Sequence, residues 1–377
     1  MGKGLTLQGE HMTTQSNVVV LPVDTATLRI ESIALPDPDP HQVVVRQFAS
    51  GICHSQLHQM HRPRESPVVL GHESTGVVVE AGSAVTHVEP GDTVLVTWVP
   101  RNIEAIDGRM PGRATLQVAD GVAQSENVFT WADHTICDEQ YVVKVDPSIR
   151  KDVTSIIGCA VMTGAGAVIN TANVQAGQSV AIFGVGGVGL SAVVGARMAG
   201  ADPIIAIDLD DEKLQFATSF GATHTINASK TDPVEAVHEL TRHQDQFTMF
   251  KQPVSGADFA FDCIGIRTTM EQIVPACRSG HFGARTGGTA VLVGVPTTPV
   301  ELNAIDVLVN EKQFIGSIGG SCAPDRDFPR FLEWHDSGDL DLEALVTQRF
   351  RLEQINEATT ALANGEIQGR AILEFEH

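Results

Sequence analysis

Short apolar runs separated by proline and glycine dominate the N-terminal part of the chain. Three of them are NVVVLPV (17–23), LRIESIAL (28–35) and QVVVRQFASGIC (42–53), with the proline-rich turn PDPDPHQ leading into the third. VVLGHESTGVVVEAG (68–82) and GDTVLVTWV (91–99) continue the pattern. Such runs are typical of β-strands. We therefore predict a β-rich body for this part of the chain.

From Asp152 onward the apolar residues follow longer periodic segments. VTSIIGCAVMTGAGAVINTA (153–172) is typical of a helix interrupted by glycines, whereas 179–201 and 203–222 each combine a strand with a following helix. The alternation continues through ADFAFDCIG, MEQIVPACR and TAVLVGVP. This order predicts a parallel, doubly wound sheet, and hence an α/β protein with two bodies.

Length and charge narrow the possible partners. A chain of 377 residues is long enough for two domains, and its 42% hydrophobic and 19% charged residues are a globular composition. The formal net charge of −21 repels phosphate backbones and anionic lipids. We therefore expect neither a nucleic-acid partner nor a membrane partner.

The distribution of cysteines and the first residues of the chain indicate the cellular compartment in which the protein is expected. The cysteines lie singly along the chain, which fits a reducing cytosol better than a disulfide framework. No uninterrupted apolar run approaches the ~20 residues of a membrane span, and no signal segment opens the chain. We expect a cytoplasmic protein. The opening MGKGLTLQGEHM has no structural pattern, so residues 1–17 are treated as a leader or tag.

Five motifs carry a family resemblance. GICHSQLH (51–58), GHESTGVVVEAG (71–82), PGDTV (90–94), GCAVMTGAGAV (158–168) and FGVGGVGL (183–190) stand in the order and at roughly the spacing seen in zinc-dependent medium-chain alcohol dehydrogenases. The chain resembles this family from about Val18 to its end. The resemblance implies a partly opened β-barrel as catalytic domain, from 18–160 and 320–377. It also implies an inserted NAD-binding Rossmann domain, from 161–319.

The resemblance assigns a catalytic zinc ion to Cys53, His72 and Cys159. Two thiolates and an imidazole suit zinc, and three protein ligands leave a fourth position for water or substrate. Glu73 follows His72, and the resemblance implies either an outer carboxylate or a ligand that exchanges with water. Taken singly, the alternative for each cysteine is a small buried apolar residue.

A second, structural zinc is not expected. Family members that hold one have four closely spaced cysteines in the region that corresponds to 99–130, and this segment has none. Tetrahedral thiolate sites require cysteines. Two roles stay open for the segment, a border of the substrate entrance or a subunit contact.

Catalysis, by resemblance, uses zinc as a Lewis acid that polarises the alcohol oxygen. Ser55 then accepts the alcohol proton, and a ribose hydroxyl passes it to His58, which releases it to water. A histidine suits this last step because its ordinary pKa is about 6.5. The alternatives are a turn hydroxyl for Ser55 and a surface imidazole for His58. Trp98 falls at the wall of the substrate pocket.

A glycine motif marks the cofactor site. Gly184, Gly186 and Gly189 form a GxGxxG turn, which also contains Gly187, between an apolar strand and a helix. The next strand ends in Asp208, where a carboxylate can accept hydrogen bonds from the adenine ribose. In this context the turn predicts a dinucleotide site; the alternative is a glycine turn that binds nothing.

The residues after Asp208 favour NAD over NADP. Three carboxylates follow it and no arginine does, so a ribose 2′-phosphate would be repelled. The resemblance assigns further contacts to residues spread over the chain. These are Lys213 for a ribose hydroxyl, His54 and Arg370 for the pyrophosphate, and Thr163, Val188, Val293 and Val295 around the nicotinamide.

We therefore predict an NAD-dependent alcohol dehydrogenase that interconverts a primary or secondary alcohol and its aldehyde or ketone. Two alternatives stay open: a zinc-free enone or quinone reductase of the same superfamily, and a catalytically silent dinucleotide-binding protein. Relatives are dimers or tetramers. We expect a homodimer joined through the edge strand of the cofactor domain, near 314–320.

Overall fold

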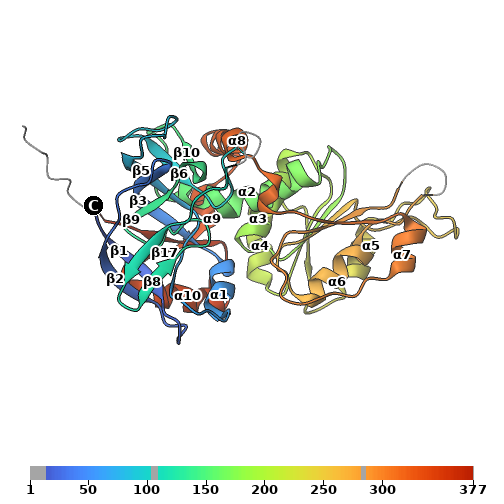
Figure 1. The fold of residues 1–377 in the computed structure, drawn as a ribbon. Coiled ribbons are helices and arrows are strands. Elements are labelled where there is room, and N and C mark those ends of the chain that lie inside the picture. Colours follow the sequence, from blue (N-terminus) through green and yellow to red (C-terminus); the bar gives the residue numbers. More distant parts are fainter. Residues whose placement is uncertain (1–13, 103–108, 282–285, 377) are drawn as a thin grey trace, which may run out of the picture.

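The computed structural model describes residues 14–102, 109–281 and 286–376, which form two bodies side by side (Figure 1). One body consists of curled, mostly antiparallel sheets and the other contains a parallel sheet. The predicted α/β fold, with a partly opened barrel and a doubly wound sheet, is confirmed.

Two sheets build the catalytic body. A five-stranded sheet has the order β2-β1-β4-β8-β7, and a seven-stranded sheet has the order β10-β6-β5-β3-β18-β17, with β9 also paired to β3. The strands are β1 (Gln15–Leu21), β2 (Arg29–Ala34), β3 (Gln42–Ile52), β4 (Val68–Val69), β5 (Ser74–Ala81), β6 (Thr93–Val96), β7 (Thr115–Val118), β8 (Gly121–Gln124), β9 (His134–Asp138), β10 (Val142–Lys144), β17 (Val346–Arg351) and β18 (Arg370–Glu374). The last strand, β18, pairs with the end of β3, which returns the C-terminus to the catalytic body.

The first strand begins earlier than expected. β1 starts at Gln15, so residues 15–17 of the predicted leader belong to the fold. Ser16 is buried and its hydroxyl donates to the carbonyl of His134. The remainder of the predicted leader, 1–13, lies outside the described residues.

The cofactor body has six parallel strands in the order β13-β12-β11-β14-β15-β16. They are β11 (Val180–Phe183), β12 (Ile204–Asp208), β13 (His224–Asn227), β14 (Phe259–Asp262), β15 (Thr289–Leu292) and β16 (Gln313–Gly316). The connecting helices are α3 (Gly187–Met198), α4 (Asp211–Phe220), α5 (Pro233–Leu240), α6 (Arg267–Ala276) and α7 (Ala304–Asn310). Because β11 lies between β12 and β14, the strand order reverses beside the glycine turn, where dinucleotides bind in such sheets.

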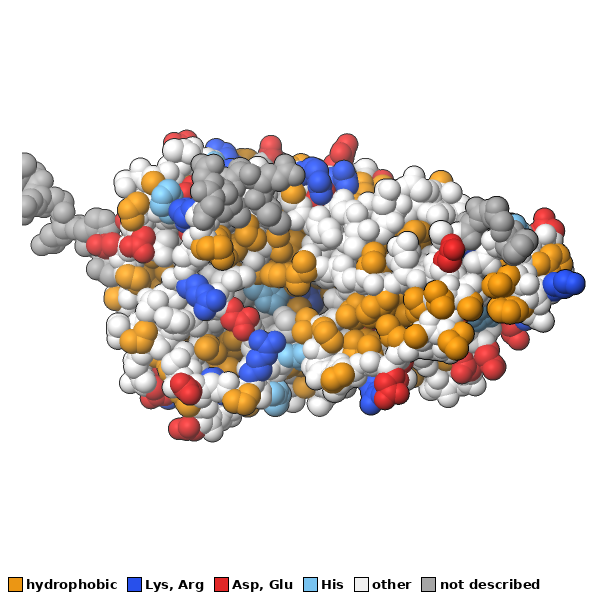
Figure 2. Space-filling model, turned by 45° about the vertical axis from the view of Figure 1, so that its right-hand side comes forward, with side chains coloured by type: hydrophobic (Ala, Val, Ile, Leu, Met, Phe, Trp, Pro, Cys, Tyr) orange, Lys and Arg blue, Asp and Glu red, His pale blue; other side chains and the backbone are white. Residues whose placement is uncertain are grey.

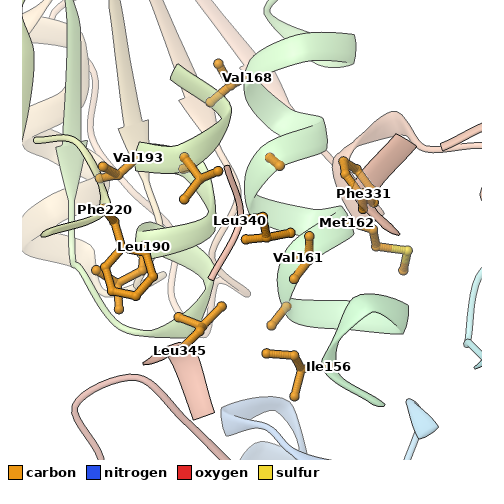
Figure 3. Packing of buried hydrophobic residues seen from close by; sticks show 14 of the residues in the cluster. Ile156, Val161, Met162, Val168, Leu190, Val193, Phe220, Phe331, Leu340 and Leu345 are labelled. Atoms are coloured by element: carbon orange, nitrogen blue, oxygen red, sulfur yellow. The ribbon is translucent and has the colours of Figure 1, made fainter. Parts of the chain in front are cut away.

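A helical run joins the two bodies. It consists of η2 (Val153–Ile156), η3 (Ile157–Val161), α2 (Met162–Gly166) and η4 (Ala167–Thr171), of which η3 and η4 are π-helical. Figure 3 shows Val161 and Val168 of this run facing Leu190 and Val193 of α3, while Phe331 lies on its other side. Val153–Thr171 is long and apolar enough to cross a membrane, whereas the sequence analysis predicted no such segment. However, 89% of its apolar window is buried inside the protein. It is therefore the core helix of a folded body.

The remaining helices belong mainly to the C-terminal segment. They are α1 (His54–His61), η1 (Glu139–Tyr141), η5 (Gly319–Ser321), α8 (Pro324–Asp336), α9 (Leu342–Leu345), η6 (Leu352–Gln354) and α10 (Ile355–Ala363). Helix α1 follows β3 directly and packs near α10. The predicted site therefore begins where the longest strand of the barrel ends.

Candidate metal and cofactor site

Three segments bring the predicted metal ligands together. Cys53 is the N-cap of α1, His72 lies between β4 and β5, and Cys159 lies in the π-helical η3. Their ligand atoms all lie within 4.8 Å of one another. Among the described residues they are the one group of three or more such side chains at this spacing. π-helical turns often mark functional sites, because they place one residue out of the α-helical register.

Two glycines permit this approach. Gly71 has φ +97°, and a Cβ there would lie 2.4 Å from the backbone nitrogen of Trp131. A Cβ at Gly158 would lie 2.5 Å from the carbonyl oxygen of Val96. Larger residues beside His72 and Cys159 would therefore push both ligands away from the cluster.

The two thiols influence each other. Cys159, Arg370 and His72 lower the pKa of Cys53 well below its usual range, against the effect of burial. The pKa of Cys159 is raised, because it lies beside Cys53 in a buried place. The two sulfurs are thus close enough for the charge of one to oppose ionisation of the other, and a cation between them would favour the thiolate form of both.

The donor set fits a zinc ion. The Nε2 atom of His72 is buried and has no hydrogen-bond partner among the described residues, while Nδ1 lies 2.5 Å from the amide nitrogen of Gln56. Zinc takes sulfur at about 2.3 Å and imidazole nitrogen at about 2.0–2.1 Å, so a tetrahedral ion spans ligand separations of this size. Cys53, His72 and Cys159 would hold it.

Glu73 lies behind this cluster rather than in it. Its carboxylate accepts a hydrogen bond from Nη2 of Arg370, and Oε2 accepts another from the Ala160 backbone at 3.2 Å. A Cβ at Gly51 would lie 2.1 Å from the Glu73 carboxylate, so β3 can pack directly against this carboxylate only because residue 51 is a glycine. Of the two roles considered for Glu73, the described contacts fit the outer carboxylate.

A pocket of about 280 Å³ opens in front of the cluster. Besides the three metal-ligand candidates, it brings together most of the other residues expected at the reaction site: His54, Ser55, His58, Trp98, Thr163, Val188, Val293 and Val295. The hydroxyls of Ser55 and Thr163 and the indole nitrogen of Trp98 are buried, and none of them has a hydrogen-bond partner within the described part of the chain. Several buried polar atoms without hydrogen bonds to other described residues thus line one pocket, as expected of a binding site.

The segment without cysteines borders this pocket. Glu126, Asn127 and Val128 line it, and the amide of Asn127 donates to the carbonyl of Trp98. Arg109 of the same segment forms two hydrogen bonds with Asp138 on the barrel. These side-chain hydrogen bonds hold the segment against the barrel. Its position along the pocket agrees with the predicted role as a border of the substrate entrance. Residues 103–108 of the segment lie outside the described residues.

The glycine turn leaves room for a dinucleotide. Gly184 has φ +86°, and a Cβ at Gly189 would lie 1.8 Å from the Gly184 carbonyl oxygen. At Gly186, the N-cap of α3, a Cβ would meet nothing within 4 Å, so the space in front of the helix amides is open. Asp208 accepts hydrogen bonds from the backbone nitrogens of Val185 and Leu209, which holds its carboxylate beside this turn.

Cationic groups lie near the same space. The Cδ atom of Arg370 would lie 3.1 Å from a Cβ at Gly187, and its Nε atom is buried without a partner. Burial lowers the pKa of His54, Cys53 raises it, and the positive charges of Arg370, His58 and Lys213 lower it further. A lowered pKa favours the neutral ring of His54, so Arg370 and Lys213 are the cations that can accommodate the anionic middle of a dinucleotide.

The sequence reading missed two features. Gln56 contacts both Cys53 and His72 and is fully buried. Arg62 and Glu126 form an ion pair of 3.2 Å at the pocket. A glutamine three residues after a candidate N-cap could have drawn attention to the first, whereas nothing in the sequence connects Arg62 with Glu126.

Comparisons with known proteins agree with this site. The family model "Alcohol dehydrogenase GroES-like domain" matches residues 39–147, and "Zinc-binding dehydrogenase" matches 187–337. The chain is 32% identical over 364 residues to an alcohol dehydrogenase class-3 from Cereibacter sphaeroides, covering 90% of this chain and 94% of that one. It is also 32% identical, with the same coverage, to an S-(hydroxymethyl)glutathione dehydrogenase from Paracoccus denitrificans.

Solved structures show the same architecture. An alcohol dehydrogenase zinc-binding domain protein from Burkholderia ambifaria superposes with a TM-score of 0.83 at 30% identity, covering 97% of this chain and all of that one. A benzyl alcohol dehydrogenase from Acinetobacter calcoaceticus gives a TM-score of 0.81 at 26% identity, covering 96% of this chain and all of that one. Both bodies are therefore shared with these proteins.

The pairing of Arg370 with Glu73 predicts a stability effect. Arg370→Met leaves a fully buried carboxylate without its cation, and removal of one partner from such a pair costs about 3–5 kcal/mol. Adding Glu73→Gln should recover part of this loss, because the remaining group is then neutral. Denaturant unfolding of metal-free wild type, both single variants and the double variant measures it. Additive effects of the two substitutions would contradict the pairing.

Proposed function

The chain belongs to the zinc-dependent medium-chain alcohol dehydrogenases, and from this premise we propose that it interconverts a primary or secondary alcohol and its aldehyde or ketone, with NAD as hydride carrier. The observation that carries the proposal is the Cys53, His72 and Cys159 cluster at one side of the pocket that Val188, Val293 and Thr163 also line. Metal, alcohol and nicotinamide can meet in this one pocket.

The chain's own residues have separate tasks in this reaction. Cys53, His72 and Cys159 would hold the zinc ion, which would supply Lewis-acid chemistry at the substrate oxygen. The Ser55 hydroxyl would accept the alcohol proton while it gives up its own proton in the direction of His58, on the next turn of α1. His58 would take up that proton and release it to water. Glu73 keeps a negative charge behind the cluster, held by Arg370.

NAD is preferred because of the groups around Asp208. Its carboxylate is fixed by backbone nitrogens at the end of β12, ready to accept from ribose hydroxyls. Asp210 is the N-cap of α4, with two further acids in the first helical turn. A 2′-phosphate would meet these carboxylates, with Lys213 alone of the α4 residues to offset them.

The pocket walls favour an apolar substrate. Val69, Leu70, Val128 and Ile318 line the pocket together with Trp98. Such walls bind alkyl or aryl groups through the loss of apolar surface to water. We therefore propose an alcohol whose carbinol carbon bears an apolar group, in agreement with the similarity to a benzyl alcohol dehydrogenase.

A homodimer completes the proposal. Figure 2 shows hydrophobic side chains gathered along the cofactor body. In α7, beside the edge strand β16, no residue is buried, and Ile305 and Leu308 are 70% and 76% exposed. Association through this edge would cover them.

Light scattering should give the mass of two chains for wild type and of one chain for Leu308→Asp.

Zinc content tests the metal site directly. Protein purified without added metal should carry about one zinc ion per chain and oxidise alcohols with NAD. Cys159→Ala should lose both properties, whereas Cys277→Ala, which changes a buried cysteine of the cofactor body, should keep them. A value near zero, with no gain on adding zinc, would instead favour the zinc-free reductase. Two ions per chain would point to a further site in 99–130.

Cofactor preference tests the role of Asp208. Asp208→Gly combined with Asp210→Arg removes the ribose carboxylate and adds a cation, so kcat/KM with NADP relative to NAD should rise by about tenfold or more. Glu239→Arg on the surface of α5 controls for charge alone. An unchanged ratio would mean that another group reads the ribose.

The proton release step tests His58. His58→Ala should slow alcohol oxidation most at low pH, where hydroxide cannot replace the base, and added imidazole should restore part of the rate. His61→Ala is the matched control, because His61 lies on the same helix with Nδ1 against the carbonyl of Leu57 and does not line the pocket. An identical pH profile for wild type and His58→Ala would remove His58 from the relay.

A further inference from the structure

Gln56 connects two of the three metal-ligand candidates. It lies in the first turn of α1 and is fully buried. Its Oε1 atom accepts the backbone N–H of Cys53 at 2.8 Å, and its Nε2 atom lies 2.5 Å from Nδ1 of His72. The Nε2 atom of His72 is buried and has no partner, so it is the ring nitrogen left for a metal.

The hydrogen bond between Gln56 and His72 requires a proton arrangement that a metal-bound histidine cannot have. The backbone N–H of Cys53 is always a donor and already occupies the amide oxygen of Gln56. If Nε2 of His72 binds a metal, the ring proton must sit on Nδ1, which makes Nδ1 a second donor. A glutamine has one acceptor oxygen and one donating nitrogen. If the Gln56 amide were rotated by 180°, its oxygen could accept from Nδ1 of His72. Its NH2 group would then face the backbone N–H of Cys53, and both groups are donors.

We propose that Gln56 is a positioning residue of the metal site that stabilises the metal-free tautomer of His72. In the metal-free protein its amide donates to Nδ1, and the proton of His72 stays on Nε2. Metal binding moves that proton to Nδ1 and sacrifices one of the two hydrogen bonds of Gln56. The inference rests on the zinc site proposed above and adds that the chain holds its zinc less tightly than the same cluster with a carboxylate at 56.

A carboxylate would remove the mismatch. Histidines that bind metals usually donate their second N–H to a carboxylate, a backbone carbonyl or water, and loss of such partners changes metal affinity by about 10–100-fold. Glutamate has the length of glutamine and two acceptor oxygens, so it can accept from Cys53 and from His72 at once. Gln56→Glu should therefore raise zinc affinity by about tenfold or more. Gln56→Met removes the hydrogen bond that favours the metal-free tautomer, so it should bind zinc at least as tightly as wild type.

The experiment is a zinc titration of the metal-free full chain in competition with a chromophoric chelator. It compares wild type, Gln56→Glu, Gln56→Met and Gln59→Glu. Gln59 lies one turn further along α1 and lines the same pocket, so Gln59→Glu adds the same charge without touching His72. Circular dichroism of each metal-free variant checks the fold.

Tighter binding by Gln56→Glu but not by Gln59→Glu, with no loss of zinc affinity in Gln56→Met, supports the inference. Equal affinity of Gln56→Glu and wild type overturns it, and so does equal tightening by the two glutamate variants, which would reflect charge only. If Gln56→Glu does not fold, weaker zinc binding by Gln56→Met than by wild type still overturns the inference.

The ring nitrogens of His72 give a second readout, which needs no metal. Nitrogen-15 NMR of the metal-free wild type should find the His72 proton on Nε2, with the resonance assigned by its loss in His72→Asn. A proton on Nδ1 overturns the inference. Failure of the proposed zinc site is a different result, because wild type itself would then take up no zinc while this readout still decides the role of Gln56.

Discussion

The buried pair of Arg370 and Glu73 connects the parts of this molecule that have to work together. Arg370 comes from β18, near the C-terminus, and Glu73 follows His72 at the start of the barrel sheet. The pair lies between the metal-ligand cluster and the glycine turn at Gly187. Because both groups are shielded from water, each depends on the other for its charge. The pairing of β18 with β3 therefore has a chemical consequence as well as a structural one.

Close backbone approach is the second constraint. Cys159 reaches Cys53 because the helical run that carries it passes directly beside the barrel at Gly158, and the same run packs against α3 at Gly164. A Cβ at Gly164 would lie 2.0 Å from the carbonyl oxygen of Val188. One apolar segment thus fixes both the distance between the thiols and the position of α3, the helix that follows the glycine turn. The 89% burial of this segment explains why its membrane-like composition is compatible with a core helix.

The electrostatics of the site oppose the overall charge. The chain carries a net charge of −21, yet Arg370, Lys213 and two histidines lie close enough to influence one another beside the glycine turn. A local positive region within an acidic protein can attract an anionic dinucleotide while the remaining surface repels polyanions. At the end of β12 the sign reverses, because Asp208 is the last residue of the strand and Asp210 is the N-cap of the next helix. Under the proposed function, these carboxylates would face the ribose and the cations would face the pyrophosphate.

The sequence by itself determined the fold class and the glycine turn, because these depend on residue type and on local spacing along strands and helices. The resemblance of its motifs to a family named Cys53, His72 and Cys159 as metal-ligand candidates. The tertiary structure alone decided which atoms touch. Glu73 could be an outer carboxylate or a ligand until Arg370, 297 residues away, was found on its carboxylate. Likewise, the first strand takes in Gln15 because Ser16 meets His134, and Gln56 matters because Cys53 and His72 both reach its amide. Hydrogen-bond direction depends on the relative position of two segments, and neither segment's own sequence contains that information.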